Sequence, residues 1–137
     1  TQSLPRPLES SMERRTKVLV VDDDKLVLKL TRARLESAGY EVVTRSESLG
    51  TSQAIVEEAP DVVLLDINMP ALAGDTLAEI VRRNPRAADV PIIFHSGEAL
   101  SVVQSRARDV GALGALPKTD DDASFLAQFE RLLKRAV

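Results

Sequence analysis

Acidic side chains end two apolar segments of the sequence. Asp22 ends "KVLVVD" (17–22) and is followed by Asp23 and Asp24, and Asp66 ends "DVVLLD" (61–66). Carboxylates are costly to bury unless they are paired, hydrogen-bonded or bound to a cation. If these carboxylates meet in one crevice, a bound proton or a divalent cation must relieve their repulsion. Oxygen ligands of this kind suit Mg²⁺, although carboxylates alone do not distinguish Mg²⁺ from Ca²⁺.

Two further polar residues follow later apolar segments. Ser96 ends "PIIFHS" (91–96), and Lys118 comes directly after "LGALP" (113–117). A serine hydroxyl can donate a hydrogen bond, and a lysine ammonium is a point charge suited to a phosphoryl oxygen. Each residue also has an ordinary interpretation, since serine often caps a helix and most lysines are surface residues. Their chemistry depends on whether these segments end at the same edge of one sheet.

The apolar patterning predicts strands and helices in alternation. Short apolar runs rich in β-branched residues indicate buried strands, and apolar residues at helical spacing indicate the helices between them. In 25–38 this spacing is Val27, Leu28, Thr31, Leu35 and Ala38, with Gly39 as the stop. The expected strands are 17–22, 40–44, 61–66, 91–96 and 113–117; the expected helices are 25–38, one ending before Pro60, 74–83, one near 98–110, and a last one with Phe125, Phe129, Leu132 and Leu133 on its core stripe.

This alternation is typical of an α/β protein with helices on both faces of a parallel sheet. Five strands in a chain of this length favour a flavodoxin-like (βα)5 three-layer sandwich with strand order 2-1-3-4-5. Ligands of such folds bind outside the carboxyl ends of the strands, where strands one and three flank the switch point. We therefore expect Asp22, Asp23 and Asp66 to meet in that crevice.

Composition limits the class of protein. The 137 residues are 44% hydrophobic and 28% charged, carry a net charge of −3 and include no cysteine. These values predict one globular domain at 16–137 after a flexible tail or linker remnant at 1–15. They exclude disulfide and zinc–thiolate chemistry and fit a cytoplasmic location. Without a basic stripe or a long apolar run, we expect neither direct nucleic acid binding nor membrane insertion.

The ordered segments carry a family resemblance. "VLVVDDD" (18–24), "DVVLLDINMP" (61–70), "PIIFHSG" (91–97) and "LPK" (116–118) resemble a CheY-like response regulator receiver domain of two-component signalling, over about residues 16–136. The resemblance implies that Asp66 is the phosphoacceptor and that Ser96 and Lys118 contact the phosphoryl group. It also implies Mg²⁺ as cofactor, held by Asp22, Asp23, Asp66 and the backbone carbonyl of Asn68.

The resemblance further implies partners. A sensor histidine kinase or histidine phosphotransfer protein would supply the phosphoryl group, and a downstream protein or a fused output domain would respond to it. Asn68 and Glu98 lie two residues beyond Asp66 and Ser96, where family members have side chains that influence hydrolysis of the phosphoryl group. The expected role is that of a phosphoacceptor rather than an enzyme.

Two positions depart from the family pattern. Ala115 stands where an aromatic residue usually lies, and Thr119 follows Lys118 where a proline is usual. These changes put in question how a signal is transmitted and how the lysine loop is held. His95 is the chain's single histidine, but it is out of phase with Ser96, so we expect it to pack away from the crevice.

Two other functions compete with the phosphoacceptor role. Ala115 favours a receiver-like scaffold that binds partners without phosphorylation, whereas Asp66, Ser96 and Lys118 argue against it. "DDDK" (22–25) also satisfies the Asp-x-Asp signature of haloacid-dehalogenase-like phosphatases, with Asp22 as nucleophile. That family needs a later acidic pair and usually a cap insertion, and we find neither in the sequence.

Overall fold

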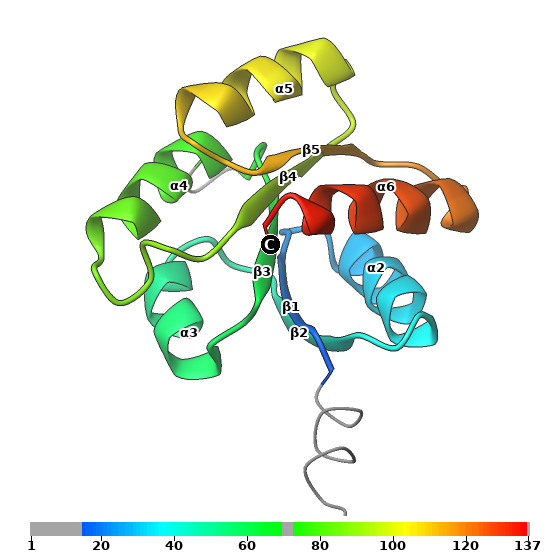
Figure 1. The fold of residues 1–137 in the computed structure, drawn as a ribbon, viewed down its shortest axis with the longest axis horizontal. Helices are drawn as coiled ribbons and strands as arrows, with labels where there is room; N and C mark the ends of the chain where they lie inside the picture. Colours follow the sequence, from blue (N-terminus) through cyan, green and yellow to red (C-terminus); the bar gives the residue numbers. More distant parts are fainter. Residues whose placement is uncertain (1–14, 70–72, 137) are drawn as a thin grey trace, which may run out of the picture.

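The computed structural model describes residues 15–69 and 73–136, which form a three-layer α/β fold (Figure 1). Five parallel strands lie in the order β2-β1-β3-β4-β5, which confirms the predicted flavodoxin-like fold. Along the chain the elements are β1 (Lys17–Val21), α2 (Lys25–Ser37), β2 (Glu41–Arg45), α3 (Thr51–Glu58), β3 (Val62–Asp66), α4 (Gly74–Arg83), β4 (Ile92–Ser96), α5 (Leu100–Asp109), β5 (Gly114–Pro117) and α6 (Asp122–Lys134).

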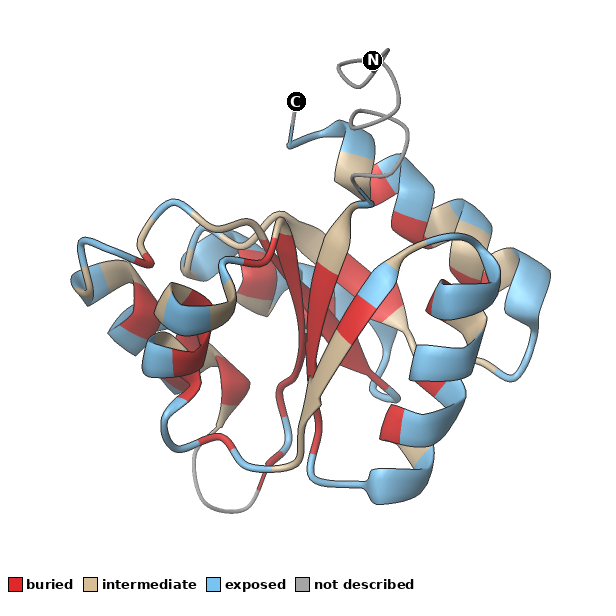
Figure 2. Ribbon diagram, turned by 90° about the horizontal axis from the view of Figure 1, so that it is seen from below, coloured by how far each residue is buried: buried red, intermediate tan, exposed pale blue. Residues whose placement is uncertain are grey.

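A separate hydrophobic core covers each face of the sheet. Helices α2 and α6 pack on one face, where Leu35, Phe125 and Phe129 are fully buried. Helices α3, α4 and α5 cover the other face, where Leu77 and Phe94 are buried. The central strands are therefore buried on both sides, and the helices turn their exposed residues outward (Figure 2).

Local signals in the sequence account for several element ends. The Asp24 carboxylate caps α2 by accepting hydrogen bonds from the backbone N–H groups of Leu26 and Val27. Gly39 ends that segment in a left-handed conformation with φ of 94°, which glycine adopts at little cost. Ala59 has a φ of 49° at the C-cap of α3, directly before Pro60.

The structure corrects details of the sequence-based assignment. Ala38 was expected on the core stripe but is the exposed C-cap of α2, because the helix ends one residue earlier. Leu133 is only partly buried. Of the predicted tail at 1–15, only Arg15 lies within the described residues, so the division at residue 16 stays a prediction. No helix in the described part of the chain is long and apolar enough to cross a membrane.

Candidate functional site

Three carboxylates converge at the carboxyl ends of two neighbouring strands. β1 and β3 pair in register, with Val21 opposite Leu65, so Asp22 and Asp66 emerge side by side. Carboxylate oxygens of Asp22, Asp23 and Asp66 all lie within 4.8 Å of one another. Asp22 and Asp66 are buried, whereas Asp23 is exposed. The crevice expected from the strand order is therefore present, with its negative charge open to solvent on one side.

Asp22 provides an oxygen that is suited to a cation. Its Oδ1 accepts a hydrogen bond of 2.9 Å from the backbone N–H of Asp24. Its Oδ2 is buried and has no hydrogen-bond partner among the described residues. Lys118 Nζ is 2.9 Å from this oxygen, which makes an ion pair but not a well-directed hydrogen bond. A hard divalent cation fits such a donor set, because it binds carboxylate oxygens and offsets their crowded charge.

Asp66 is the most central of these carboxylates. It ends β3 and is 4% exposed, and its Oδ1 accepts a hydrogen bond from the backbone N–H of Asn68 at 3.1 Å. Burial raises the pKa of Asp66, and the neighbouring charges of Asp22 and Asp23 raise it further. The Asn68 N–H and the Lys118 ammonium act in the opposite direction. A cation in the crevice would favour the ionised, nucleophilic form.

Lys118 connects the fifth strand to the acidic crevice. Its Nζ lies 2.9 Å from Asp22 Oδ2 and 3.7 Å from Asp66 Oδ1. The Lys118 backbone N–H donates to the Ser96 carbonyl at 2.8 Å, which aligns the ends of β4 and β5. The loop that follows is held from α2, where the Arg34 guanidinium donates to the Thr119 carbonyl. This contact answers how the lysine loop is held without the proline that was expected at position 119.

The Ser96 hydroxyl lies beside Asn68 at the end of β4. Its Oγ accepts a hydrogen bond from the Glu98 backbone N–H at 3.0 Å and a longer one of 3.4 Å from Asn68 Nδ2. With both contacts directed to the oxygen, the hydroxyl proton remains available for donation. Ser96 is 1% exposed, so its hydroxyl group is shielded from bulk water.

Two residues that sequence reasoning overlooked help to shape these loops. Gly74 begins α4 so close to β3 that an added Cβ would lie 2.5 Å from Ile67 Cα and 2.8 Å from the Asp66 carbonyl oxygen. Arg106 on α5 forms ion pairs with Asp75 at 3.1 Å and with Glu98 at 3.3 Å. The glycine was visible in the sequence only as a helix start, and no local pattern linked the arginine to its partners.

His95 packs on the face of the sheet that α2 and α6 cover, in agreement with its phase in β4. Its ring meets Phe125 of α6 edge to face, with centroids 5.7 Å apart. Burial lowers the pKa of His95 to about 3, and the charges of Lys118 and Arg34 act in the same direction. The imidazole is therefore neutral at physiological pH and belongs to the core.

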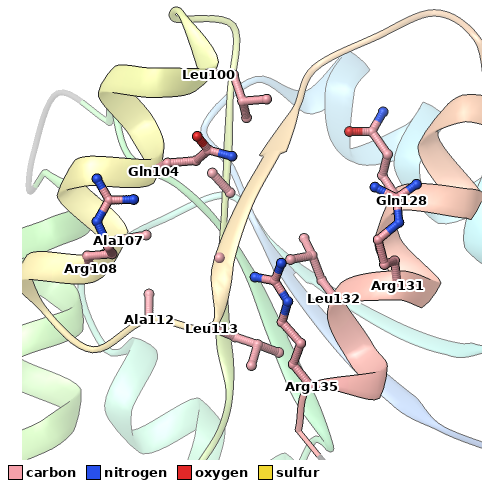
Figure 3. Close-up of a pocket in the computed structure, with 12 residues that line it drawn as sticks. Leu100, Gln104, Ala107, Arg108, Ala112, Leu113, Gln128, Arg131, Leu132 and Arg135 are labelled. Atoms are coloured by element: carbon pink, nitrogen blue, oxygen red, sulfur yellow. The ribbon is translucent and has the colours of Figure 1, made fainter.

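Ala115 lies on β5, away from the carboxylates and beneath the space between α5 and α6. It is 8% exposed and borders a hollow with Leu100, Gln104 and Leu132 among its neighbours (Figure 3). No aromatic ring from β5 occupies this space. The structure thus separates the acidic crevice from the position at which the aromatic residue was expected.

Comparison with known proteins matches this architecture. The family model described as the response regulator receiver domain covers residues 18–132. The DNA-binding dual master transcriptional regulator RpaA of Synechocystis is 32% identical over 121 residues, covering 87% of this chain and 49% of RpaA. The transcriptional regulatory protein KdpE of Mycobacterium tuberculosis is 33% identical over 120 residues, covering 88% of this chain and 52% of KdpE. The chain thus spans about half the length of these curated relatives.

Solved structures give the same result for the fold. The chemotaxis protein CheY4 of Vibrio cholerae superimposes with a TM-score of 0.79 at 28% identity, covering 87% of this chain and 99% of that protein. A response regulator of Chloroflexus aurantiacus described as putative also has a TM-score of 0.79, at 26% identity, over 88% of this chain and 99% of its own.

Proposed function

This chain belongs to the response regulator receiver domain family, and from that premise we propose that Asp66 accepts a phosphoryl group from a histidine kinase or a histidine phosphotransfer protein. One observation carries the proposal. The Asp66 carboxylate ends a central strand within 4.8 Å of the Asp22 and Asp23 carboxylates and 3.7 Å from the Lys118 ammonium. Asp22 has similar neighbours, with Lys118 at 2.9 Å, so the choice of Asp66 also rests on the resemblance to receiver domains, in which the acid that ends the third strand accepts the phosphoryl group.

The reaction is a substitution at phosphorus. An Asp66 oxygen attacks the phosphorus atom, the phosphorus–nitrogen bond to the donor histidine breaks, and the electron pair leaves with the imidazole. Asp66 Oδ1 already meets the Asn68 N–H and the Lys118 ammonium, whereas Oδ2 makes no hydrogen bond or ion pair with a described residue, so we assign the attack to Oδ2. The product is an aspartyl acyl phosphate.

We propose Mg²⁺ as the cofactor, held by Asp22, Asp23, Asp66 and the backbone carbonyl of Asn68. The buried Oδ2 of Asp22, which accepts no hydrogen bond from a described residue, and the closeness of the three carboxylates support this assignment. When bound, the ion offsets negative charge on the transferring phosphoryl oxygens. Asp23 and Asp66 would bind it directly and Asp22 through water.

Lys118 and Ser96 would respond to the product. The phosphoryl group adds roughly −1.5 to −2 charges at Asp66. Lys118 is then placed to exchange part of its ion pair with Asp22 for a contact to a phosphoryl oxygen. The Ser96 hydroxyl can likewise donate a hydrogen bond to a phosphoryl oxygen. Movement of the Ser96 loop would report phosphorylation to a downstream protein or a fused output domain.

The test is phosphorylation by a small phosphodonor such as acetyl phosphate, with and without Mg²⁺, followed by intact-mass spectrometry. We expect one added phosphoryl group that requires Mg²⁺ and is removed by hydroxylamine, which cleaves acyl phosphates. Asp66→Asn should gain none, whereas Asp109→Asn, which changes an exposed carboxylate on α5, should behave as wild type. Phosphorylation of Asp66→Asn at the wild-type rate would rule out the assignment.

The alternative role, a scaffold that does not depend on phosphorylation, gains some support from Ala115. Its methyl group supplies no ring that can turn inward and change the surface over β5. A downstream partner that binds Asp66→Asn as tightly as the phosphorylated wild type would favour this role.

A further inference from the structure

The loop that carries Lys118 is short and is anchored at both ends. Strand β5 ends at Pro117, and the next residue, Lys118, donates its backbone N–H to the Ser96 carbonyl at 2.8 Å. At the other end, Asp121 is the N-cap of α6, and its backbone N–H donates to Thr119 Oγ1 at 3.1 Å. The segment between these two anchors sets where the Lys118 side chain starts.

Arg34 of α2 holds this segment from outside the loop. Its Nη1 donates to the Thr119 carbonyl at 2.6 Å, and its Nε forms an ion pair with Asp122 in the first turn of α6. The guanidinium carbon lies 5.3 Å from the centroid of the Phe125 ring. Helices α2 and α6 lie side by side on one face of the sheet, which allows these contacts between residues far apart in the sequence (Figure 1). One side chain thus connects the loop, the start of α6 and the hydrophobic core.

Burial distinguishes Arg34 from two other arginines that form ion pairs. Its side chain is 12% exposed, compared with 27% for Arg106 and 45% for Arg32. An ion pair at the surface contributes little, because solvent and salt screen the charges and both side chains lose conformational freedom. Arg34 is shielded from solvent, lies over an aromatic ring and uses two nitrogens for two partners. These contacts fix the planar guanidinium in one geometry, which suits it to holding a backbone position.

A fixed loop matters because the effect of Lys118 depends on where its ammonium lies. The Nζ is 2.9 Å from Asp22 Oδ2 and 3.7 Å from Asp66 Oδ1. A lysine ammonium is a point charge on a flexible stem, so its position follows that of the backbone that carries it. The attraction between charges falls with distance, and a small displacement of a group that acts on a reacting centre lowers the rate.

We propose that Arg34 is a positioning residue for phosphoryl transfer, which holds the loop through the Thr119 carbonyl and so keeps the Lys118 ammonium at the acidic crevice. The proposal rests on the proposed function, in which Lys118 contacts the phosphoryl group, and adds to it a residue of α2 that sets the rate. Arg34 does not touch the reacting atoms and acts only through Lys118. Loss of Arg34 should therefore make Lys118 more mobile and, as a consequence, slow phosphorylation.

The first measurement requires neither phosphorylation nor metal. NMR relaxation of the lysine ε-CH2 groups in the metal-free protein reports how mobile each lysine side chain is, and Lys118→Gln identifies the Lys118 signal by its loss. We expect the Lys118 ε-CH2 group to be ordered in wild type and mobile in Arg34→Gln. Arg34→Lys keeps the charge but not the forked set of donors, so its Lys118 should have intermediate mobility.

Arg32→Gln is the matched control. Arg32 lies on the same helix, is exposed, and donates to a backbone carbonyl, that of Val42, at 3.1 Å. Its replacement removes the same charge and a hydrogen bond of the same kind, but not a contact to the lysine loop. We expect Lys118 to stay ordered in this variant.

The second measurement is the rate of phosphorylation by acetyl phosphate with Mg²⁺. We expect the rate to fall about tenfold in Arg34→Gln, less in Arg34→Lys, and not at all in Arg32→Gln. In a protein that already carries Lys118→Gln, Arg34→Gln should slow the reaction no further, because no ammonium remains to be positioned. This dependence on Lys118 separates positioning from a general loss of stability.

The proposal is overturned if Lys118 stays ordered in Arg34→Gln, if Arg32→Gln has the same effects, or if Arg34→Gln slows phosphorylation as much without Lys118 as with it. If Arg34→Gln does not fold, Arg34→Lys takes its place, and a Lys118 as ordered as in wild type then overturns the proposal. Failure of the wild type to gain a phosphoryl group would instead overturn the proposed function, and the NMR comparison would still decide whether Arg34 holds Lys118.

Discussion

The Lys118 ammonium lies 2.9 Å from Asp22 Oδ2, a buried oxygen with no hydrogen-bond donor among the described residues. Lys118 thus neutralises part of the charge of a carboxylate that the proposed Mg²⁺ would reach through water. Lys118 and the proposed Mg²⁺ would therefore compete for the charge of these carboxylates.

Replacing Lys118 with Gln should strengthen Mg²⁺ binding several-fold, because the ion then faces the full charge of Asp22 and Asp66. Isothermal titration calorimetry of the wild type and of Lys118→Gln at the same pH and salt would measure this. Lys29→Gln, at an exposed position on α2, controls for the change in net charge. Weaker Mg²⁺ binding in Lys118→Gln would show that the lysine organises the site instead of competing for it.

Gly74→Ala should weaken Mg²⁺ binding and destabilise the fold by about 1–3 kcal/mol, the usual cost of overpacking. Its Cβ would meet Ile67 Cα and the Asp66 carbonyl oxygen, which forces the β3–α4 segment to shift. Urea denaturation and metal titration measure the two effects. Gly97→Ala is the matched control, because nothing lies within 4 Å of a Cβ added there. Equal effects of the two substitutions would contradict this role of close packing.

The ion pair between Asp75 and Arg106 should stabilise the folded protein near neutral pH and lose this effect in acid. The hydrogen bond and charge of Arg106 lower the pKa of Asp75 from its ordinary value of 3.8. A carboxylate whose pKa is lowered by folding stabilises the folded state at pH values above its pKa in the unfolded chain. This stabilisation is lost as the pH falls through its pKa in the folded protein. We expect Asp75→Asn to be less stable than wild type at neutral pH by up to about 1 kcal/mol, and the difference to shrink below about pH 4. A difference that stays constant with pH would exclude the ion pair as its cause.

His95 should make the protein sensitive to mild acid. Because burial lowers its pKa to about 3, the folded protein keeps a neutral imidazole while the unfolded chain binds a proton near 6.5. The neutral, buried His95 stabilises the folded state fully above pH 6.5. As the pH falls below 6.5 this stabilisation is lost, and the free energy of unfolding is lower by about 1.4 kcal/mol one pH unit below that value. Chemical denaturation at a series of pH values without Mg²⁺ would measure this loss.

His95→Leu provides the comparison, since leucine also removes the buried Nε2, which lacks a partner among the described residues. Its stability should fall less steeply between pH 7 and 5 than that of wild type. Parallel pH profiles for the two proteins would mean that another group accounts for the acid sensitivity.

Hydrolysis of the phosphorylated protein should depend more on Asn68 than on Glu98. The positions of Asn68 and Glu98 in the sequence suggested that both side chains orient the attacking water. In the structure the Glu98 carboxylate forms an ion pair with Arg106. Asn68 Nδ2, by contrast, lies 3.4 Å from Ser96 Oγ, beside Asp66. After removal of the phosphodonor, we expect Asn68→Ala to lose its phosphoryl group several-fold more slowly and Glu98→Ala to change little. Decay followed by mass spectrometry tests this, and a double variant that decays at the wild-type rate would exclude both residues.

The sequence alone predicts the fold and the place of the acidic crevice. Apolar runs that end in Asp22 and Asp66 indicate buried strands, and the alternation with helices leaves few ways to order them in a parallel sheet. Once the order is known, the carboxyl ends of β1 and β3 must be neighbours. The two ends of α2, at Asp24 and Gly39, can also be predicted from the sequence, because capping and a left-handed turn depend on adjacent residues.

Only the tertiary structure decided which distant side chains meet. Arg106 on α5 meets Asp75 because α5 lies beside the first turn of α4, and no spacing along the chain predicts a contact between residues 31 positions apart. Arg34 reaches Thr119 from 85 positions away, which explains the lysine loop that the sequence left open. Local periodicity fixes which face of an element is buried, whereas contacts between elements depend on how those faces pack together in three dimensions.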